Sequence, residues 1–441
     1  MKTLTSNVSL PVLMFINSIV PILILIIFFY SVSVQGQDTI RVIPDGTMGE
    51  SLEPIDSLEK KKFPKNINIF TGRISSFKAG LGFLYDYAAY SQDEEAKQQM
   101  DSADVTLENQ FKVRDMRVMA NGQFTTKRVI TWKIGLMYDG PNREWLMRET
   151  GFTIAVPEIS GHLFIGRTKE GYSLNKVMNG YAGWTMERQM ALDIIPILAD
   201  GIKWIGFLPE KRIVWNIGIY DDIFSEDESF STYDWQTSAR VGWLPIFLPK
   251  ENKQLHMGLS YRYGKTDNGE MRVRSRPESN PAPYFVDTEN FNTDHSNHFG
   301  TELYYTHGAL MLGGEYHWHK FSSPEKGDPM FQGGDIVVSY IFTGASRPYS
   351  TVSGVYSFVP VEKSIFKGGW GEVEGLLRFS AIDLNDGLIN GGELWRITPM
   401  VNWYMSKNIR LELSYGYSVL DRFQLSGATQ FFQARVQFAI L

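Results

Sequence analysis

The sequence predicts an all-β protein: a transmembrane, antiparallel, up-and-down β-barrel of about 16 strands (16–18). Three observations predict this fold. Segments of about nine residues alternate between apolar and polar side chains, which is the length that a tilted strand needs to cross a bilayer. Very short turns and long polar loops connect these segments. Aromatic residues make up 14% of the 441 residues, which suits a barrel with aromatic girdles at both membrane interfaces.

The clearest strand pair covers residues 393–417 and turns at residues 406–408. After the turn, one face carries Ile409, Leu411, Leu413, Tyr415 and Tyr417, and the other carries Arg410, Glu412, Ser414 and Gly416. Successive side chains of a strand point to opposite faces, so this ribbon has one apolar and one polar side. We assign the apolar face to lipid, the polar face to an aqueous lumen and the turn to the periplasmic side.

The connections between the predicted strands are of two kinds. Short turns are expected at 121–122, 307–308 and 406–408. Long polar loops are expected at 93–109, 221–233, 276–298, 322–332 and 347–367. Outer-membrane barrels have short turns at the periplasmic end and longer loops at the other end. Only a closed barrel leaves no unpaired strand edge in lipid, so the membrane assignment also predicts closure.

The chain divides into three predicted parts. Residues 1–36 resemble a signal peptide, because Lys2 precedes a long apolar run and short residues precede position 37. The alternative is an uncleaved signal anchor, since the run is long enough to span a membrane. Residues 37–65 are polar and are predicted to form a periplasmic tail. Residues 66–441 are predicted to form the barrel, in the outer membrane of a Gram-negative-type envelope.

Composition and motifs exclude several functions. A net charge of −6 gives no electrostatic case for binding nucleic acid. The chain has no cysteine and none of the common short motifs of hydrolases, zinc proteases or nucleotide-binding folds, so we expect no enzyme and no cofactor. A membrane-embedded hydrolase remains the alternative. Glu315, His317 and His319 share one face of a strand and could bind a metal, but an aqueous lumen also accommodates them, and no metal site is predicted.

Several segments resemble the phosphate-selective porin O and P family. These are GHLFIGRTKEGYSL (161–174) with TMERQM (185–190), RVRSRPE (272–278) with FVDT (285–288), EYHW (315–318), and GWGEVE (369–374) with RFS (378–380) and DLND (383–386). The resemblance covers about residues 66–441. It implies a 16-stranded outer-membrane barrel, a homotrimer and a diffusion channel for anions such as phosphate. It also implies a third extracellular loop that folds inward, and it places this constriction within 169–205.

The strongest candidates for binding an anion are Arg272, Arg274 and Arg276. Their spacing of two places them on one face of a strand, about 6.5–7 Å apart. A guanidinium offers a fork of donors to phosphate or carboxylate oxygens, so such a row along a pore could pass an anion from site to site. The alternative is an exposed hairpin arm whose arginines pair with Glu270 and Glu278.

Two further candidates, Arg167 and Lys169, lie at the entry to the inferred constriction loop. They could line the narrow part of the pore. Alternatively, they could anchor the loop through ion pairs with Glu170 or Glu187.

These observations predict a porin that forms a water-filled diffusion channel and prefers anions such as phosphate. The alternatives are a non-selective general porin and a structural or adhesive barrel with a filled lumen. The expected partners are phosphate or other small anions, outer-membrane lipid and, by resemblance, two further copies of the chain in a homotrimer. Nucleic acid is not an expected partner.

Overall fold

The computed structural model describes residues 69–224 and 233–440. The predicted signal peptide (1–36) and periplasmic tail (37–65) lie outside the described residues. Of the predicted barrel, residues 66–68, 225–232 and 441 lie outside them as well.

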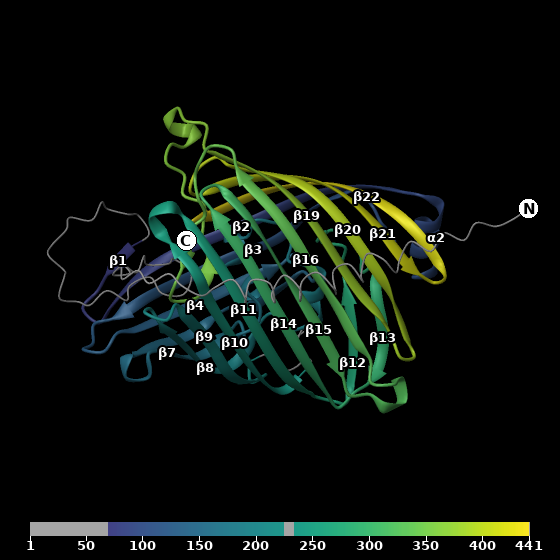
Figure 1. The fold of residues 1–441 in the computed structure, drawn as a ribbon, viewed down its shortest axis with the longest axis horizontal. Helices are drawn as coiled ribbons and strands as arrows, with labels where there is room; N and C mark the ends of the chain where they lie inside the picture. The colour runs from purple at the N-terminus through teal and green to yellow at the C-terminus, as the bar shows by residue number, and fades with distance from the viewer. Residues whose placement is uncertain (1–68, 225–232, 441) are drawn as a thin grey trace, which may run out of the picture. The chain divides into compact units, whose positions relative to one another are not determined.

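Long antiparallel strands make up most of the described chain (Figure 1). The strands of the main sheet are β1 (Ile69–Thr71), β2 (Ser75–Gln92), β3 (Gln110–Phe124), β4 (Ile130–Asp139), β5 (Glu144–Met147), β6 (Thr150–Val156), β7 (Gly161–Thr168), β8 (Ala199–Leu208), β9 (Ile213–Asp221), β10 (Tyr233–Leu248), β11 (Lys253–Thr266), β14 (His295–His307), β15 (Leu310–Phe321), β16 (Met330–Ile341), β19 (Glu372–Asp386), β20 (Ile389–Tyr404), β21 (Ile409–Arg422) and β22 (Leu425–Ile440). The described helices are α2 (Glu94–Ser102), the single turn α3 (Leu174–Val177) and short 3-10 turns. None of these helices is long and apolar enough to span a membrane.

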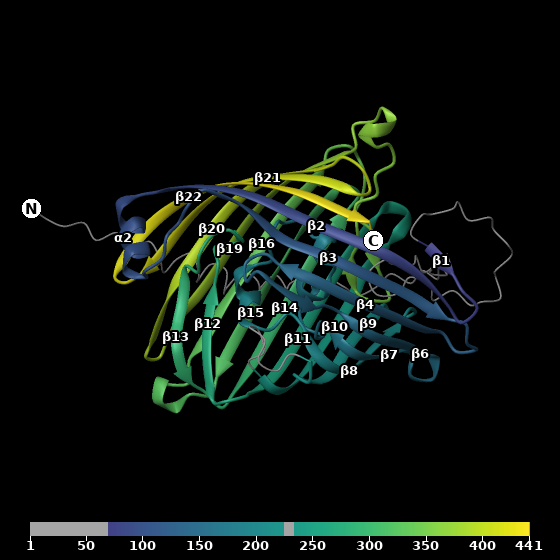
Figure 2. The same ribbon diagram turned by 180° about the vertical axis from the view of Figure 1, so that it is seen from behind.

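The sheet closes on itself because β2 pairs with β3 on one side and with β22 on the other (Figure 2). The main sheet contains 18 strands among the described residues. However, β5 and β6 both pair with β4 and share one position in the wall, and β1 only extends the start of β2 as a hairpin. The wall is therefore a closed 16-strand antiparallel barrel, as predicted.

The barrel has its apolar side chains outside and its polar side chains inside. In β21, Arg410 and Glu412 are 4% and 0% exposed, whereas Leu413 and Tyr415 are 39% and 45% exposed. A water-soluble barrel would show the reverse pattern, because burying charge is costly and burying apolar surface is favourable. The alternation along this strand thus confirms which face points to lipid and which to the lumen.

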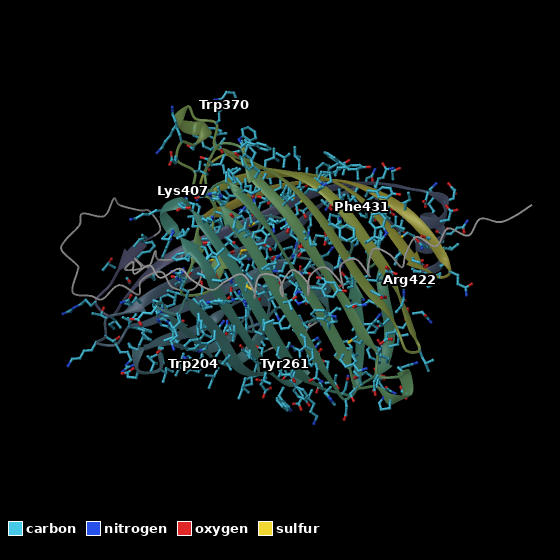
Figure 3. The ribbon with its side chains drawn as sticks, in the orientation of Figure 1. Trp204, Tyr261, Trp370, Lys407, Arg422 and Phe431 are labelled. Atoms are coloured by element: carbon cyan, nitrogen blue, oxygen red, sulfur yellow. The ribbon has the colours of Figure 1, made fainter. Side chains whose placement is uncertain are left out.

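The two ends of the barrel differ in their connections. Short turns at 209–212, 249–252 and 405–408 lie at one end, together with the start of β2 and the end of β22. In Figure 3, Lys407 marks this short-turn end and Arg422 marks the opposite end, where α2 and most long loops lie. Two details of the sequence prediction are wrong. Asn121 and Gly122 lie within β3 rather than in a turn, because β3 stays paired with β2 and β4 on either side of them.

The second difference is the long connection between β16 and β19, residues 342–371. It begins and ends at the short-turn end, because successive strands alternate in direction. It contains β17 (Tyr349–Ser350), β18 (Val355–Tyr356) and the 3-10 turn η7 (Ile365–Lys367). A polar composition alone did not reveal which end this connection occupies.

Three connections enter the lumen. Residues 169–198, between β7 and β8, and a hairpin of β12 (Glu270–Ser275) and β13 (Val286–Asn292), between β11 and β14, enter from the long-loop end. The middle of the β16–β19 connection enters from the short-turn end. Each has buried apolar side chains that pack on the wall or on another of these segments. The prediction of an inward-folded loop thus describes only the first of three segments that narrow the lumen.

Candidate functional site

Strand β12 of the hairpin alternates as strictly as a strand of the wall. Met271 and Val273 are buried and belong to an apolar cluster that includes Phe291 of β13 and Phe321 and Phe431 of the wall. The side chains that alternate with them, at positions 270, 272 and 274, point to the other face and are exposed. The apolar face therefore fixes the hairpin inside the barrel, and the polar face is left to line open space.

A cavity of about 540 Å³ lies between this polar face and residues 187–197 of the inward loop. Its charged lining consists of the cations Arg114, Lys176, Arg188, Arg272, Arg274 and Arg276 and the carboxylates Glu187, Asp193, Asp267, Glu270 and Glu278. All three arginines singled out from the sequence thus line one cavity. The sequence did not indicate the other three cations, which come from β3 and from the inward loop.

Arg272 is neutralised by a carboxylate. Its Nε and Nη2 donate to the two oxygens of Asp287 at 2.8 and 2.6 Å, and Glu289 lies 3.9 Å away. This bidentate pair differs from the expected alternative, in which Glu270 and Glu278 were the partners. Glu278 instead pairs with Arg378 of the wall at 3.1 Å.

Arg274 and Arg276 share an aromatic partner rather than an acid. Their guanidinium carbons lie 4.1 and 4.2 Å from the centre of the Tyr284 ring. The Arg276 Nε also donates to the carbonyl oxygen of Ala282 at 2.9 Å. Among the described residues no carboxylate forms an ion pair with either guanidinium. A cation over an aromatic face keeps its full charge, so these two side chains present positive charge to the cavity, and the charge of Arg276 also acts on Asp193.

Arg167 and Lys169 lie elsewhere. Arg167 is fully buried, with its Nη1 3.4 Å from Asp200 of β8, and Lys169 donates to the carbonyl oxygen of Met178 at 2.5 Å. Neither lines the cavity. Burial and the nearby Arg188 hold the pKa of Lys169 well below its usual range. These contacts fit the anchoring alternative, although with partners other than Glu170 or Glu187, and a pore-lining role for the two side chains stays a prediction.

Glu187 ties the inward loop to two strands. It accepts hydrogen bonds from Arg114 Nε at 2.9 Å and Arg114 Nη2 at 3.2 Å, and it also pairs with Arg435 of β22. Arg435 in turn donates to both oxygens of Asp86 at 2.6 and 2.7 Å. Burial alone would raise the pKa of Glu187, but the two arginines lower it to about 2. The carboxylate is therefore ionised at neutral pH and holds the loop beside the cavity.

Asp193 is the carboxylate of the loop that remains open to the cavity. It accepts a hydrogen bond from Ser275 Oγ at 2.8 Å, and its side chain is exposed to the lumen. The surrounding protein removes much of the bulk water, and this desolvation raises the pKa of Asp193 to about 6. Its charge can thus change within a physiological range of pH.

The third inward segment meets the loop from the short-turn end. Arg347 donates to both oxygens of Glu374 at 2.9 and 3.0 Å and to the carbonyl oxygen of Ala182 at 3.1 Å. Trp184 of the loop packs edge-on against Tyr356, with ring centres 5.8 Å apart. This contact joins the two segments, and neither ring lines the cavity.

The histidines of β15 have partners in the wall and the loop. His317 Nδ1 lies 3.0 Å from Tyr172 Oη, and His317 Nε2 lies 3.0 Å from Gln189 Nε2. His319 Nδ1 lies 2.7 Å from His298 Nδ1. Among the described residues no group of three or more His, Asp or Glu side chains has an arrangement that could hold a metal ion.

Comparison with known proteins places this barrel in a family. Residues 77–440 match the family described as phosphate-selective porin O and P. The chain belongs to this family. The match covers the described wall from β2 to β22, and it makes the chain an outer-membrane β-barrel of a Gram-negative envelope. The family and the fold are those of a channel rather than of an enzyme.

Three individual proteins add detail. An uncharacterised protein of Caulobacter vibrioides is 27% identical over 177 residues, which cover 39% of this chain and 35% of that relative. The match thus spans only about a third of that protein's length. An anion-selective porin from Comamonas acidovorans has a TM-score of 0.51 at 13% identity, with 83% of this chain and 100% of that chain covered. A trimer form of OmpT of Vibrio cholerae has a TM-score of 0.50 at 10% identity, with 83% and 100% covered. The last two are similar in fold alone.

Proposed function

We propose that this porin is a passive diffusion channel that prefers anions, phosphate among them, and that the preference arises at the cavity between the hairpin and the inward loop. The observation that carries the proposal is the pair Arg274 and Arg276. Both line the cavity and neither has a carboxylate partner among the described residues. Selectivity in a pore depends on the charges that line it rather than on the net charge of the chain.

The two arginines would act as weak, exchangeable sites. The aromatic ring of Tyr284 orients both guanidiniums without cancelling their charge. A permeating anion exchanges water for guanidinium donors and leaves again, because each contact is open to solvent. Arg272 contributes less, since Asp287 already occupies its donors. In the row inferred from the sequence, Arg274 and Arg276 therefore carry the anion contacts.

The proposal is tested with the purified full-length chain in planar bilayers. Reversal potentials in asymmetric potassium chloride and potassium phosphate give the anion-to-cation permeability ratio. We expect a ratio above one in both salts. The absence of conductance would favour a structural barrel with a filled lumen, and a ratio near one would favour a general porin. A preference for cations would refute the anion proposal.

We also propose that the chain assembles as a homotrimer. The resemblance to its family and the trimer form recorded for the similar OmpT support this assembly. Native mass spectrometry in mild detergent would give three chains per particle if the proposal is right, and one chain per particle would refute it.

A further inference from the structure

The cavity is larger than an inorganic anion requires. Its volume of about 540 Å³ lies within the range of sites that hold small organic molecules, roughly 300–1,000 Å³. Its wall is not uniformly basic either. Amide and hydroxyl side chains line it beside the arginines, namely Asn268, Ser279, Asn280 and Asn290. These neutral groups can donate to phosphate, but their oxygens can also accept hydrogen bonds from the hydroxyl groups of a ligand.

Asn280 makes the chemical requirement specific. Its side chain is 6% exposed and lines the cavity, and its Oδ1 has no hydrogen-bond partner among the described residues. A buried acceptor is costly unless a donor reaches it. Chloride offers no donor and inorganic phosphate carries few P–OH groups, whereas a polyhydroxylated organic molecule offers several donors. A turn of the Asn280 amide about its Cβ–Cγ bond would present this buried acceptor to the cavity, where a ligand with hydroxyl groups could donate to it.

Asp193 supports the same chemistry. Its carboxylate is open to the cavity and accepts a hydrogen bond from Ser275 Oγ at 2.8 Å. Next to a site for inorganic anions alone, this negative charge works against binding. For a hydroxylated ligand it is a strong acceptor, because hydrogen bonds to a charged group exceed those between neutral groups. Anion donors at Arg274 and Arg276 and hydroxyl acceptors at Asn280 and Asp193 thus line one space.

We propose that the cavity binds a polyhydroxylated organic anion. Its carboxylate or phosphate monoester contacts Arg274 and Arg276, and its hydroxyl groups donate to Asn280 and Asp193. This inference rests on the proposed function, because the ligand must be an anion that enters by diffusion. It goes further in naming the class of solute that is held longest.

The test measures how added solutes block the current of single channels in potassium chloride. The solutes are glucuronate, glucose 6-phosphate, inorganic phosphate and glucose. We expect at least one of the two organic anions to reach half-block at a concentration about tenfold below that of phosphate or glucose, the gain expected from roughly two added hydrogen bonds. Glucuronate against glucose 6-phosphate decides whether the anionic group is a carboxylate or a phosphate.

A variant tests whether the block of the current depends on Asn280 Oδ1. Asn280→Ala should raise the half-blocking concentration of the organic anion about fivefold and leave that of phosphate unchanged. The matched control is Asn142→Ala, in the exposed turn after β4 and outside the cavity, which should change neither value. Wild-type single-channel conductance shows that a variant is folded. If Asn280→Ala forms no channels, Asn280→Ser is measured instead. Its hydroxyl is a shorter acceptor, so the half-blocking concentration of the organic anion should again rise.

Two results would overturn the inference: organic anions that block no better than phosphate, or a loss at Asn280→Ala that is equal for phosphate and for the organic anion. If either result is found together with an anion-selective reversal potential, the proposed function is still supported and only the inference about the ligand is refuted. A cation-selective reversal potential would refute both the proposed function and this inference.

Discussion

Replacing Arg274 by Glu should reduce the anion preference of the channel. The substitution changes the local charge by two units at a side chain that lines the cavity and has no carboxylate partner. For a monovalent anion about 6 Å away, one charge in water contributes about 0.7 kcal/mol, and screening at physiological salt roughly halves this. Two units therefore amount to about 0.7 kcal/mol, or a factor of about three in local anion concentration.

Cations gain by the same factor, so the anion-to-cation permeability ratio should fall about tenfold for Arg274→Glu and about threefold for Arg274→Gln. Reversal potentials in a potassium chloride gradient measure this ratio. The control is the double variant Arg272→Gln with Asp287→Asn, which removes an ion pair of the same hairpin without changing its net charge. A fall of less than twofold for Arg274→Glu, or an equal fall in the control, would show that the row does not face the ion path.

Three further predictions follow from the loop and the two ends of the barrel. Glu187→Ala should raise the single-channel conductance and the noise of the current, because Arg114 and Arg435 then no longer hold the inward loop through Glu187. Unchanged single-channel traces would contradict this prediction. As the pH falls from 7 to 5, Asp193 takes up a proton because its pKa is raised to about 6, so the cavity loses a negative charge and the anion preference should rise. Asp193→Asn should abolish this pH dependence. A pH dependence that persists in the Asp193→Asn variant would refute the assignment. In this chain without cysteine, Lys407→Cys should react with a maleimide linked to a polymer too large for the pore only from the periplasmic side, and Asn142→Cys only from the outside. Labelling of both from one side would contradict the assigned ends.

The wall could be predicted from the sequence because its side chains obey a local rule. Alternation along β21 reports directly which residues meet lipid, since each strand must place its apolar side chains outward at every second position. The inward connections obey no such rule. The segment 342–371 has the composition of a surface loop. Only the number of strands that cross the membrane before it shows that it lies at the short-turn end. Its burial comes from contacts such as Arg347 with Glu374, which are 27 residues apart.

The candidate site was found in part for the same reason. The spacing of Arg272, Arg274 and Arg276 predicted a shared face; in the structure Arg272 and Arg274 lie on the exposed face of β12, Arg276 follows its end, and all three line the cavity. The spacing could not show which of the three arginines has a carboxylate partner, since the carboxylate that neutralises Arg272 lies 15 residues away on β13. Arg114 gave no separate signal either, because it resembles any other lumen-facing arginine until Glu187 of the loop meets it.

An acidic chain can still favour anions if its charges are divided between wall and loops. The wall arginines Arg240, Arg378 and Arg435 each contact a carboxylate of the wall, at 2.8, 2.9 and 2.6 Å. Such pairs add little net field, and they fix the lumen so that the inward segments have surfaces to pack on. Positive charge without an acidic partner is found on the hairpin, at Arg274 and Arg276, next to the cavity. The net charge of −6 belongs to the whole chain, whereas a permeating ion responds to the charges within a Debye length of about 8 Å. The unpaired arginines of the hairpin can therefore set the selectivity of a chain that is acidic overall.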